Sequence, residues 1–181
     1  ESVPKDVVVG LDEAYNEYIP PAERVDTAAW LADFPNLVIC RTFSKIYGLA
    51  GLRIGYGLAS AAVADLMNRV RQPFNVNNLA LAGAVAALDD VDFLNASYEL
   101  NRAGMAQIVA ALDQLGLEHI PSCGNFVTFR AGDAAAVNQK LLQQGVIVRP
   151  IAGYGLPEWL RVTIGKAEEN ARFIEALQKA L

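Results

Sequence analysis

The 181-residue sequence has few charges, only two cysteines and a single histidine, and each shortage excludes a class of protein. Charged residues make up 19% of the chain and the net charge is −5 with no basic cluster, so we expect no nucleic-acid partner. His119, alone, cannot build a histidine-based metal site, and we predict no metal and an ordinary strand residue. Cys40 and Cys123 form no metal-ligand pair, so we expect two reduced, buried thiols of a cytoplasmic protein.

Long apolar runs are also lacking, although apolar residues make up 53% of the chain. No run approaches the roughly 20 residues that cross a bilayer, so we expect no membrane partner. The apolar excess is then buried inside the fold or against a partner. The chain begins with ESVPKDVVVGL, without an initiator methionine, signal peptide or transit sequence, which leads us to expect a piece of a longer protein.

Short apolar runs in the first half predict strands at the centre of a sheet. Residues 7–11 and 37–40 are typical of fully buried strands in a parallel sheet, and residues 52–58 form a third candidate. Helices are predicted between and after these strands, at 26–34 with Asp26 as N-cap, at 61–70 and at 77–88.

The second half begins with a long amphipathic helix at 92–115, whose apolar residues recur at spacings of three, four and seven. Strands and helices then alternate in a smaller α/β layer: strands at 125–130, 145–149 and 159–164, and helices at 133–144 and 167–181. We therefore expect an α/β protein with three parts: a first domain at 1–90, a connecting helix at 91–116 and a small C-terminal α/β domain at 117–181.

The segment RTFSKIYGLAGLRIGYG, residues 41–57, places Lys45 just after a predicted central strand. Ligands of open α/β sheets bind beyond the carboxyl ends of the strands, where a desolvated lysine becomes a nucleophile. Thr42, Ser44 and Arg53 could bind a phosphate there. The alternative is an exposed lysine in a glycine-rich loop, and spacing alone favours that alternative.

Asp12 also ends a predicted strand, so it and Lys45 could face one crevice. A carboxylate there can keep a pyridinium nitrogen protonated and make the ring an electron sink. Tyr15 follows three residues later, where its phenol could reach a ring oxygen. The alternatives are that Asp12 initiates a loop and that Tyr15 serves packing.

Two arginines of the second half could recognise anionic groups. Alternation in WLRVTI, residues 159–164, places Arg161 on the polar face of its strand, where its planar fork suits a carboxylate. Arg149 ends another strand. For both residues the alternative is a surface ion pair.

Six motifs, in order and over nearly the whole chain, resemble those of histidinol-phosphate aminotransferases. They are DEAYNEY (12–18), RTFSKIYGLAGLRIGYG (41–57), RQPFNVNNLA (71–80), GNFVTF (124–129), GVIVRP (145–150) and GYGLPEWLRVTIG (153–165). The resemblance implies the aspartate-aminotransferase fold and pyridoxal 5'-phosphate as cofactor. Residues 1–90 would be the later part of a cofactor-binding large domain with a mainly parallel sheet, and 117–181 most of the small domain.

The resemblance assigns roles to particular residues. Lys45 is similar to the lysine that binds the cofactor covalently, Asp12 to the partner of the pyridine nitrogen and Tyr15 to the partner of the 3-oxygen. The cofactor phosphate would be held by Thr42, Ser44 and Arg53. The substrate pocket would include Arg161 for the α-carboxylate, with Arg149 and Asn125 near the substrate phosphate.

The resemblance implies amino transfer between L-histidinol phosphate and 2-oxoglutarate by a cytoplasmic homodimer acting on small-molecule substrates. It also implies that a long N-terminal half, with further cofactor contacts, is missing here. We therefore expect the 181-residue chain to be inactive alone, to bind the cofactor weakly and to self-associate.

Two other functions stay open at this point. One is a related aminotransferase for aromatic amino acids, or a phosphothreonine decarboxylase, because much of the substrate pocket would lie in the missing half. The other is a non-catalytic binding or assembly module, which would lack the visible absorbance of a lysine-bound cofactor.

Overall fold

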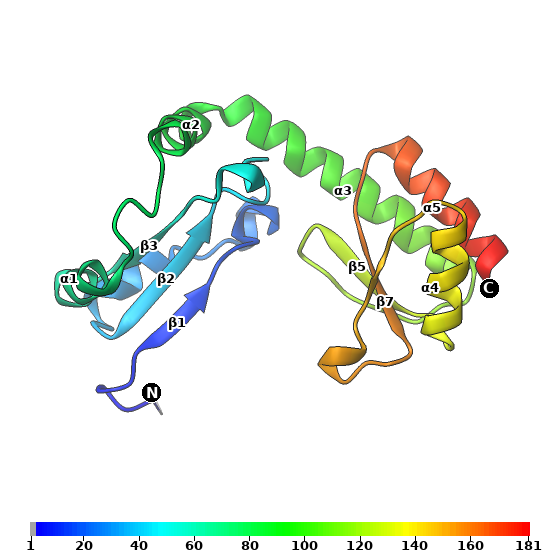
Figure 1. Ribbon diagram of the computed structural model, residues 1–181, viewed down its shortest axis with the longest axis horizontal. Helices are drawn as coiled ribbons and strands as arrows, with labels where there is room; N and C mark the ends of the chain where they lie inside the picture. Colours follow the sequence, from blue (N-terminus) through cyan, green and yellow to red (C-terminus); the bar gives the residue numbers. More distant parts are fainter. Residues whose placement is uncertain (1–2) are drawn as a thin grey trace. The chain divides into compact units, whose positions relative to one another are not determined.

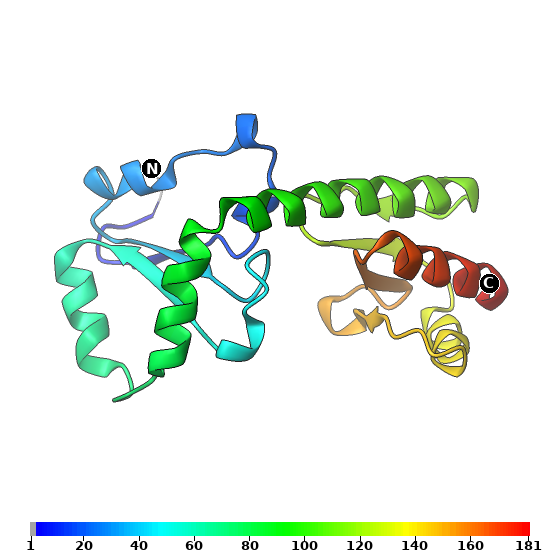
Figure 2. The ribbon, with the colours of Figure 1, turned by 90° about the horizontal axis from the view of Figure 1, so that it is seen from above.

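The computed structural model describes residues 3–181, which form two compact units. The first unit ends at Asn95, and the second runs from Ala96 to Leu181. The division falls within α3 (Val91–Gln114), the long helix that Figures 1 and 2 show in green. Each unit has its own sheet and core and is described by itself.

The first unit is built on a three-stranded sheet with β2 in the centre (Figure 1). Strand β1 (Val9–Asp12) pairs with β2 (Leu37–Thr42) in parallel, and β3 (Gly55–Ala59) pairs with β2 in the antiparallel sense. Short 3₁₀ helices and two α-helices complete the unit: η1 (Asn16–Tyr18), η2 (Pro21–Glu23), η3 (Thr27–Ala32), η4 (Ala50–Leu52), α1 (Ala61–Val70) and α2 (Asn78–Asp89).

The prediction of a fully buried first strand was wrong. Strand β1 begins only at Val9, and the side chains of Val7 and Val8 before it are exposed. Within the described residues β1 is an edge strand with a single neighbour, so its alternate residues stay open to solvent. The second buried strand is confirmed, because β2 has a neighbour on each side and its first three residues are buried.

The predicted helices of the first unit are confirmed at two of three places. Helices α1 and α2 begin after Ser60 and Asn77, whose side-chain oxygens accept from backbone N–H groups of the first turn, as N-caps do. The helix expected at 26–34 is the shorter 3₁₀ helix η3 (Thr27–Ala32), and the side chain of Asp26 makes no capping hydrogen bond. The third strand starts later than expected because residues 50–52 form η4.

The cysteines also differ from the prediction, since Cys40 and Cys123 are both exposed free thiols. Cys40 follows the buried Ile39 in β2, and successive residues of a strand point to opposite faces. His119 is a strand residue as expected, and its Nε2 lies 3.1 Å from Oδ1 of Asp113.

The second unit has a four-stranded antiparallel sheet in the order β4-β5-β7-β6. Its elements are β4 (His119–Ile120), β5 (Phe126–Arg130), α4 (Ala134–Gln143), β6 (Arg149–Pro150), η5 (Ala152–Tyr154), β7 (Trp159–Thr163) and α5 (Ala167–Ala180). The strand expected at 145–149 is reduced to its end, because Gly145 and Val146 form the turn that leaves α4. The remaining elements predicted in this half are confirmed.

One face of this sheet carries the core of the second unit. Leu160 and Val162 of β7 pair with Phe129 and Val127 of β5, and all four side chains are buried. Residues of α3, α4 and α5 pack on them in one cluster that includes Ile108, Leu112, Val137, Leu141, Phe173 and Leu177. The alternation predicted for 159–164 is therefore confirmed, and it leaves Arg161 on the opposite face.

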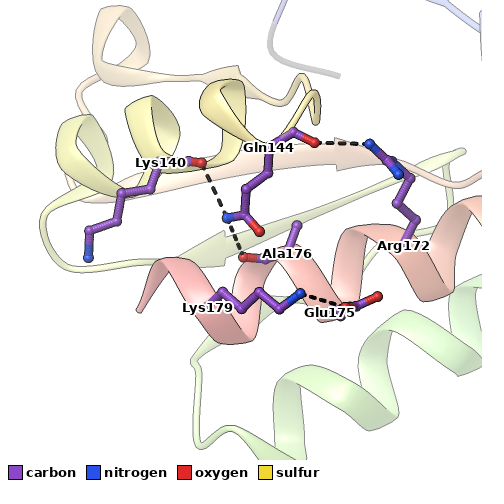
Figure 3. A network of polar contacts seen from close by, with 6 residues as sticks. All are labelled: Lys140, Gln144, Arg172, Glu175, Ala176 and Lys179. Atoms are coloured by element: carbon purple, nitrogen blue, oxygen red, sulfur yellow. Dashed lines mark hydrogen bonds and ion pairs between the residues drawn. The ribbon is translucent and has the colours of Figure 1, made fainter.

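Polar contacts tie the end of α4 to α5, as Figure 3 shows. Gln144 donates from Nε2 to the backbone oxygen of Ala176 (3.1 Å), and its own backbone oxygen accepts from Arg172 (3.0 Å). Lys140 donates to the backbone oxygen of Ala180 (2.7 Å). Since a helix leaves its last carbonyls without partners, these side chains satisfy the carboxyl ends of two helices at once.

Candidate active site

The first group of candidate residues lies at the carboxyl ends of β1 and β2. Asp12, the last residue of β1, pairs with Cys40 of β2. Parallel pairing therefore places the segment after Asp12 beside the segment that leads through Thr42 to Lys45. The carboxylate of Asp12 is exposed, and its Oδ1 accepts a hydrogen bond from the backbone N–H of Ala14 (3.0 Å).

Lys45 is partly buried rather than free in a loop. Its neighbours Phe43 and Ile46 are buried, and its Nζ lies 5.1 Å from the centre of the Tyr15 ring. An ammonium at this distance from an aromatic ring is held by the ring quadrupole. The structure thus brings together two of the predicted residues, Lys45 and Tyr15, from segments that are 30 positions apart in the sequence.

The proposed phosphate ligands are brought together only in part. The Oγ1 of Thr42 accepts from the backbone N–H of Ser44 (3.0 Å), so these two residues form one tight turn before Lys45. Arg53 has a left-handed backbone, with a φ of 53°, and its guanidinium donates to the carbonyl of Ala50 in its own loop (2.9 Å). Its exposed side chain is held by its own loop and not by Thr42 or Ser44.

Strand β3 has glycines opposite the end of β2. Gly57 and Gly55 are the partners of Cys40 and Thr42. A Cβ at Gly55 would lie 2.6 Å from the backbone oxygen of Arg41, closer than real Cβ atoms come. Glycine is therefore required at Gly55, whereas a Cβ at Gly57 would make ordinary contacts with the side chains of Met67 and Val38.

A buried polar cluster lies behind this edge, and the sequence analysis did not single it out. Glu13 accepts from Nε of Arg41 (2.8 Å) and from the hydroxyl of Thr27 (2.5 Å). Burial alone would lower the pKa of Arg41, but its hydrogen bonds to Glu13 and Tyr56 outweigh burial and raise it. The one signal in the sequence was a second acid directly after Asp12.

Burial also changes two groups beside this cluster. It raises the pKa of Glu17, against the opposing effect of its own backbone hydrogen bond and of the positive charges of Arg41 and Arg24. Burial likewise raises the pKa of Tyr47, with a further contribution from the negative charge of Glu17. Glu13, Glu17, Arg24 and Arg41 are therefore close enough to act on one another's charge.

The second group of candidate residues lies in the second unit, on the face of the sheet that has no helices. Arg149 of β6 and Arg161 of β7 are directly opposite each other. Like charges in this position repel, and among the described residues neither arginine forms an ion pair with a carboxylate. Two unneutralised guanidinium groups side by side are suited to an anionic ligand.

Aromatic rings hold both arginines in place. The guanidinium carbon of Arg161 lies 4.5 Å from the centre of the Phe126 ring. Arg149 donates from Nη2 to the phenol oxygen of Tyr154 (3.3 Å). Asn125 precedes Phe126, and its backbone oxygen accepts from the backbone N–H of Ile164 (2.8 Å), which continues the pairing of β5 with β7.

Two features are absent from residues 3–181. No cluster of three or more histidine, cysteine, aspartate or glutamate side chains in that range could hold a metal ion. No helix of that range is both long enough and apolar enough to cross a membrane.

Comparison with known proteins gives one consistent family. The family model described as aminotransferase class I and II matches residues 2–177. A histidinol-phosphate aminotransferase of Dechloromonas aromatica is 81% identical over 181 residues, which are 100% of this chain and 50% of that protein. These matches confirm the resemblance drawn from the six motifs.

Solved structures agree with that family. The histidinol-phosphate aminotransferase of Sinorhizobium meliloti, in complex with pyridoxal-5'-phosphate, is 31% identical with a TM-score of 0.89, over 98% of this chain and 50% of its own. The L-threonine-O-3-phosphate decarboxylase of Porphyromonas gingivalis is 28% identical with a TM-score of 0.82, over 97% and 55%. The chain spans about half the length of the curated relatives it matches.

Proposed function

This chain belongs to the aminotransferase class I and II family, and we propose that its full-length protein is a pyridoxal-phosphate-dependent histidinol-phosphate aminotransferase. The reaction would transfer an amino group between L-histidinol phosphate and 2-oxoglutarate, as a step of histidine biosynthesis. The observation that carries this proposal is the 81% identity to the Dechloromonas aromatica enzyme over all 181 residues.

The residues of the first unit fit pyridoxal phosphate chemically. Lys45 offers an amine for the aldehyde, Asp12 a carboxylate for the ring nitrogen and Tyr15 a phenol for the ring oxygen. The hydroxyl groups of Thr42 and Ser44 can donate to a phosphate, and the Thr42 oxygen that accepts from Ser44 keeps its own hydrogen for this purpose. Arg53 uses one N–H of its guanidinium on the carbonyl of Ala50, and its remaining N–H groups could donate to the phosphate.

Bound pyridoxal phosphate supplies an electron sink and a carrier for the amino group. Lys45 would hold the cofactor covalently and then carry a proton to and from the substrate α-carbon, which typically contributes about 10²–10⁴-fold. Asp12 would keep the proton on the ring nitrogen. Tyr15, whose ring lies against Lys45, would orient the cofactor through its 3-oxygen and keep the amine close.

The arginines of the second unit would bind the anionic groups of the substrates. We assign the α-carboxylate of glutamate to Arg161, with its guanidinium fixed over Phe126. Arg149, opposite it, would take the phosphate of histidinol phosphate, with Asn125 in the same pocket. Each arginine is a fork of donors that suits a carboxylate or a phosphate, and neither is used by a carboxylate of the described residues.

A second candidate, decarboxylation of phosphothreonine, has the support of the Porphyromonas gingivalis structure. Both reactions need a phosphate site and a carboxylate site, so the arginine pair does not separate them. Incubation of the full-length protein with each substrate does. Glutamate formation from 2-oxoglutarate and histidinol phosphate, without release of CO₂ from phosphothreonine, supports the aminotransferase; the reverse pattern overturns it.

We further propose a cytoplasmic homodimer that acts on small molecules. Exposed apolar side chains on α1 and α2, among them Leu66, Val70, Leu79 and Val85, favour association. The 181-residue chain alone would be inactive, bind the cofactor weakly and self-associate. Light scattering and a cofactor titration of this chain test the point, and a monomer that forms the visible band at micromolar cofactor contradicts it.

A further inference from the structure

Glu13 is a buried carboxylate directly after Asp12, and both of its oxygens are occupied. Its side chain is 6% exposed. Oε2 accepts from Nε of Arg41 (2.8 Å) and Oε1 from the hydroxyl of Thr27 (2.5 Å). The backbone N–H of Glu13 donates to the carbonyl of Cys40 (2.9 Å), which extends the pairing of β1 with β2 by one residue.

This arrangement places Glu13 and Asp12 on opposite faces of the sheet. Asp12 is the partner of Cys40, and Arg41, the next residue of β2, points to the other face with Glu13. The ion pair therefore ties the residue after Asp12 to the residue before Thr42. Each of the two segments that carry the proposed cofactor ligands is thus held at a residue next to a proposed ligand, Glu13 beside Asp12 and Arg41 beside Thr42.

A purely structural role is a poor explanation for this pair. The side chains of Glu13 and Arg41 are 6% and 22% exposed, and taking an ion pair largely out of water costs so much that apolar side chains of similar volume often stabilise a protein as well or better. What a charged pair adds, when its carboxylate also accepts a second hydrogen bond from Thr27, is a single geometry. The site needs that geometry, because catalytic groups must be held to within a fraction of an ångström.

We propose that Glu13 and Arg41 are positioning residues, which fix Asp12 and the turn before Lys45 in the arrangement that the cofactor requires. This proposal rests on the proposed function. It predicts that Glu13 acts on cofactor binding through Asp12 and Lys45 without touching the cofactor itself.

The test is Glu13→Gln in the full-length protein, with pyridoxal phosphate as the probe. Glutamine keeps the size and the acceptor for Thr27 but removes the charge that holds Arg41. At metal sites, loss of a residue that hydrogen-bonds to a ligand-binding group typically lowers the affinity about 10–100-fold. We therefore expect cofactor binding to weaken about tenfold. At saturating cofactor, the pH midpoint of the visible absorbance band should also shift.

Two matched variants separate positioning from stability. Thr27→Val removes the other hydrogen bond to the same carboxylate and leaves the tie to Arg41. Ile39→Ala opens the core of β2 between the same strands and removes no hydrogen bond of Glu13 or Arg41. Both should lower the melting temperature of the cofactor-free protein but leave the affinity and the pH midpoint close to those of the wild type.

Each outcome decides one question. If Glu13→Gln behaves like Ile39→Ala at equal loss of melting temperature, the pair is only structural and the inference is wrong. If the wild type itself forms no visible band with pyridoxal phosphate, the proposed function fails before the variants are compared. If Glu13→Gln does not fold, Arg41→Lys takes its place with the same expectation, because lysine keeps the charge but loses the Nε–H that donates to Glu13.

Discussion

The two units of this chain bury their apolar residues very differently. In the second unit a single cluster joins the sheet to three helices, and its members include Phe129, Leu160 and Leu177, which are almost completely buried. In the described part of the first unit, a smaller cluster of buried residues consists of Phe43, Ile54, Ala80 and Ala84. The second unit therefore has the buried core of a complete domain, whereas the described part of the first unit has no buried cluster of comparable size.

Helix α2 shows the difference most directly. Its residues are nearly all apolar, yet Leu79, Leu81, Val85 and Leu88 are exposed. A helix that is apolar all round is normally buried. The loop before it carries Phe74, which is 100% exposed and has a left-handed φ of 55°. We infer that these surfaces serve contacts with further protein, in agreement with relatives twice as long as this chain.

The ion pairs of the described residues show the opposite distribution. The first unit buries an ion pair, between Glu13 and Arg41, next to the proposed cofactor residues. In the described part of the second unit the ion pairs of Arg130 with Glu118 and Glu158 lie at the surface, where they contribute little. The comparison suggests that the first unit is shaped by a site and the second by its core.

The largest effect should come from the one lysine placed against Tyr15. Lys45→Ala in the full-length protein should abolish the visible absorbance of bound cofactor and all measurable turnover, because no other group of the site can bond to the aldehyde. Spectroscopy and borohydride reduction followed by peptide mapping measure this. Lys179→Ala, at an exposed ion pair of α5, is the control and should change neither. A cofactor-linked peptide that persists in Lys45→Ala would disprove the assignment.

The contrast in burial itself predicts a contrast in stability. Phe129→Ala should destabilise the 181-residue chain by about 3–5 kcal/mol, because a fully buried ring leaves a cavity. Phe74→Ala should change its stability by no more than about 0.5 kcal/mol, since the ring makes no buried contact there. Urea unfolding measures both. A large loss for Phe74→Ala in the chain alone would mean that the first unit is covered, through self-association for example.

The carboxylate at the end of β1 should govern rate more than binding. Asp12→Asn keeps the shape of the side chain but cannot hold the ring proton through its charge. We expect the full-length variant to bind cofactor, but its kcat should fall about 10²–10³-fold. A loss of this size is typical when one preorganised electrostatic contact is removed from an active site. Steady-state kinetics at saturating cofactor provide the measurement. A kcat near that of the wild type would leave Asp12 as the first residue of a turn, held by its bond to Ala14.

The arginine pair of the second unit should discriminate between substrates. Arg161→Lys should weaken the binding of glutamate by about 10–100-fold, which corresponds to the loss of one hydrogen bond to a charged group. It should hardly affect the binding of histidinol phosphate, which has no carboxylate. The KM for each substrate gives the comparison. Arg130→Lys, in an exposed ion pair of the same sheet, is the matched control. Equal losses for both substrates would indicate a structural role for Arg161.

The smallest expected effect concerns Glu17 beside the buried pair. Its pKa in the folded protein is raised above 4.5, so its contribution to stability is complete below that value and is lost as the pH rises through the folded pKa. Glu17→Gln should therefore be slightly more stable than the wild type at neutral pH, by no more than about 0.5 kcal/mol after solvent screening. Urea midpoints at neutral and acidic pH measure it, and a gain that is largest in acid contradicts this sign.

The sequence by itself determined most elements and their types. Alternation in WLRVTI placed Arg161 opposite the core face, and apolar spacing predicted the long helix nearly to its ends, because both signals are local and periodic. It also named Lys45 and Asp12, since each follows an apolar run that forms a strand. The motifs that identified the family are likewise contiguous in the chain.

Only the tertiary structure decided which residues share a surface. Arg149 and Arg161 lie opposite each other because of the register of β6 with β7. Lys45 contacts Tyr15 because β1 pairs with β2. Burial of Glu13 with Arg41, and exposure of Cys40 and Val8, likewise follow from sheet order and edges. A local pattern fixes the side of a strand on which a residue lies. What covers that side depends on segments that are distant in the sequence.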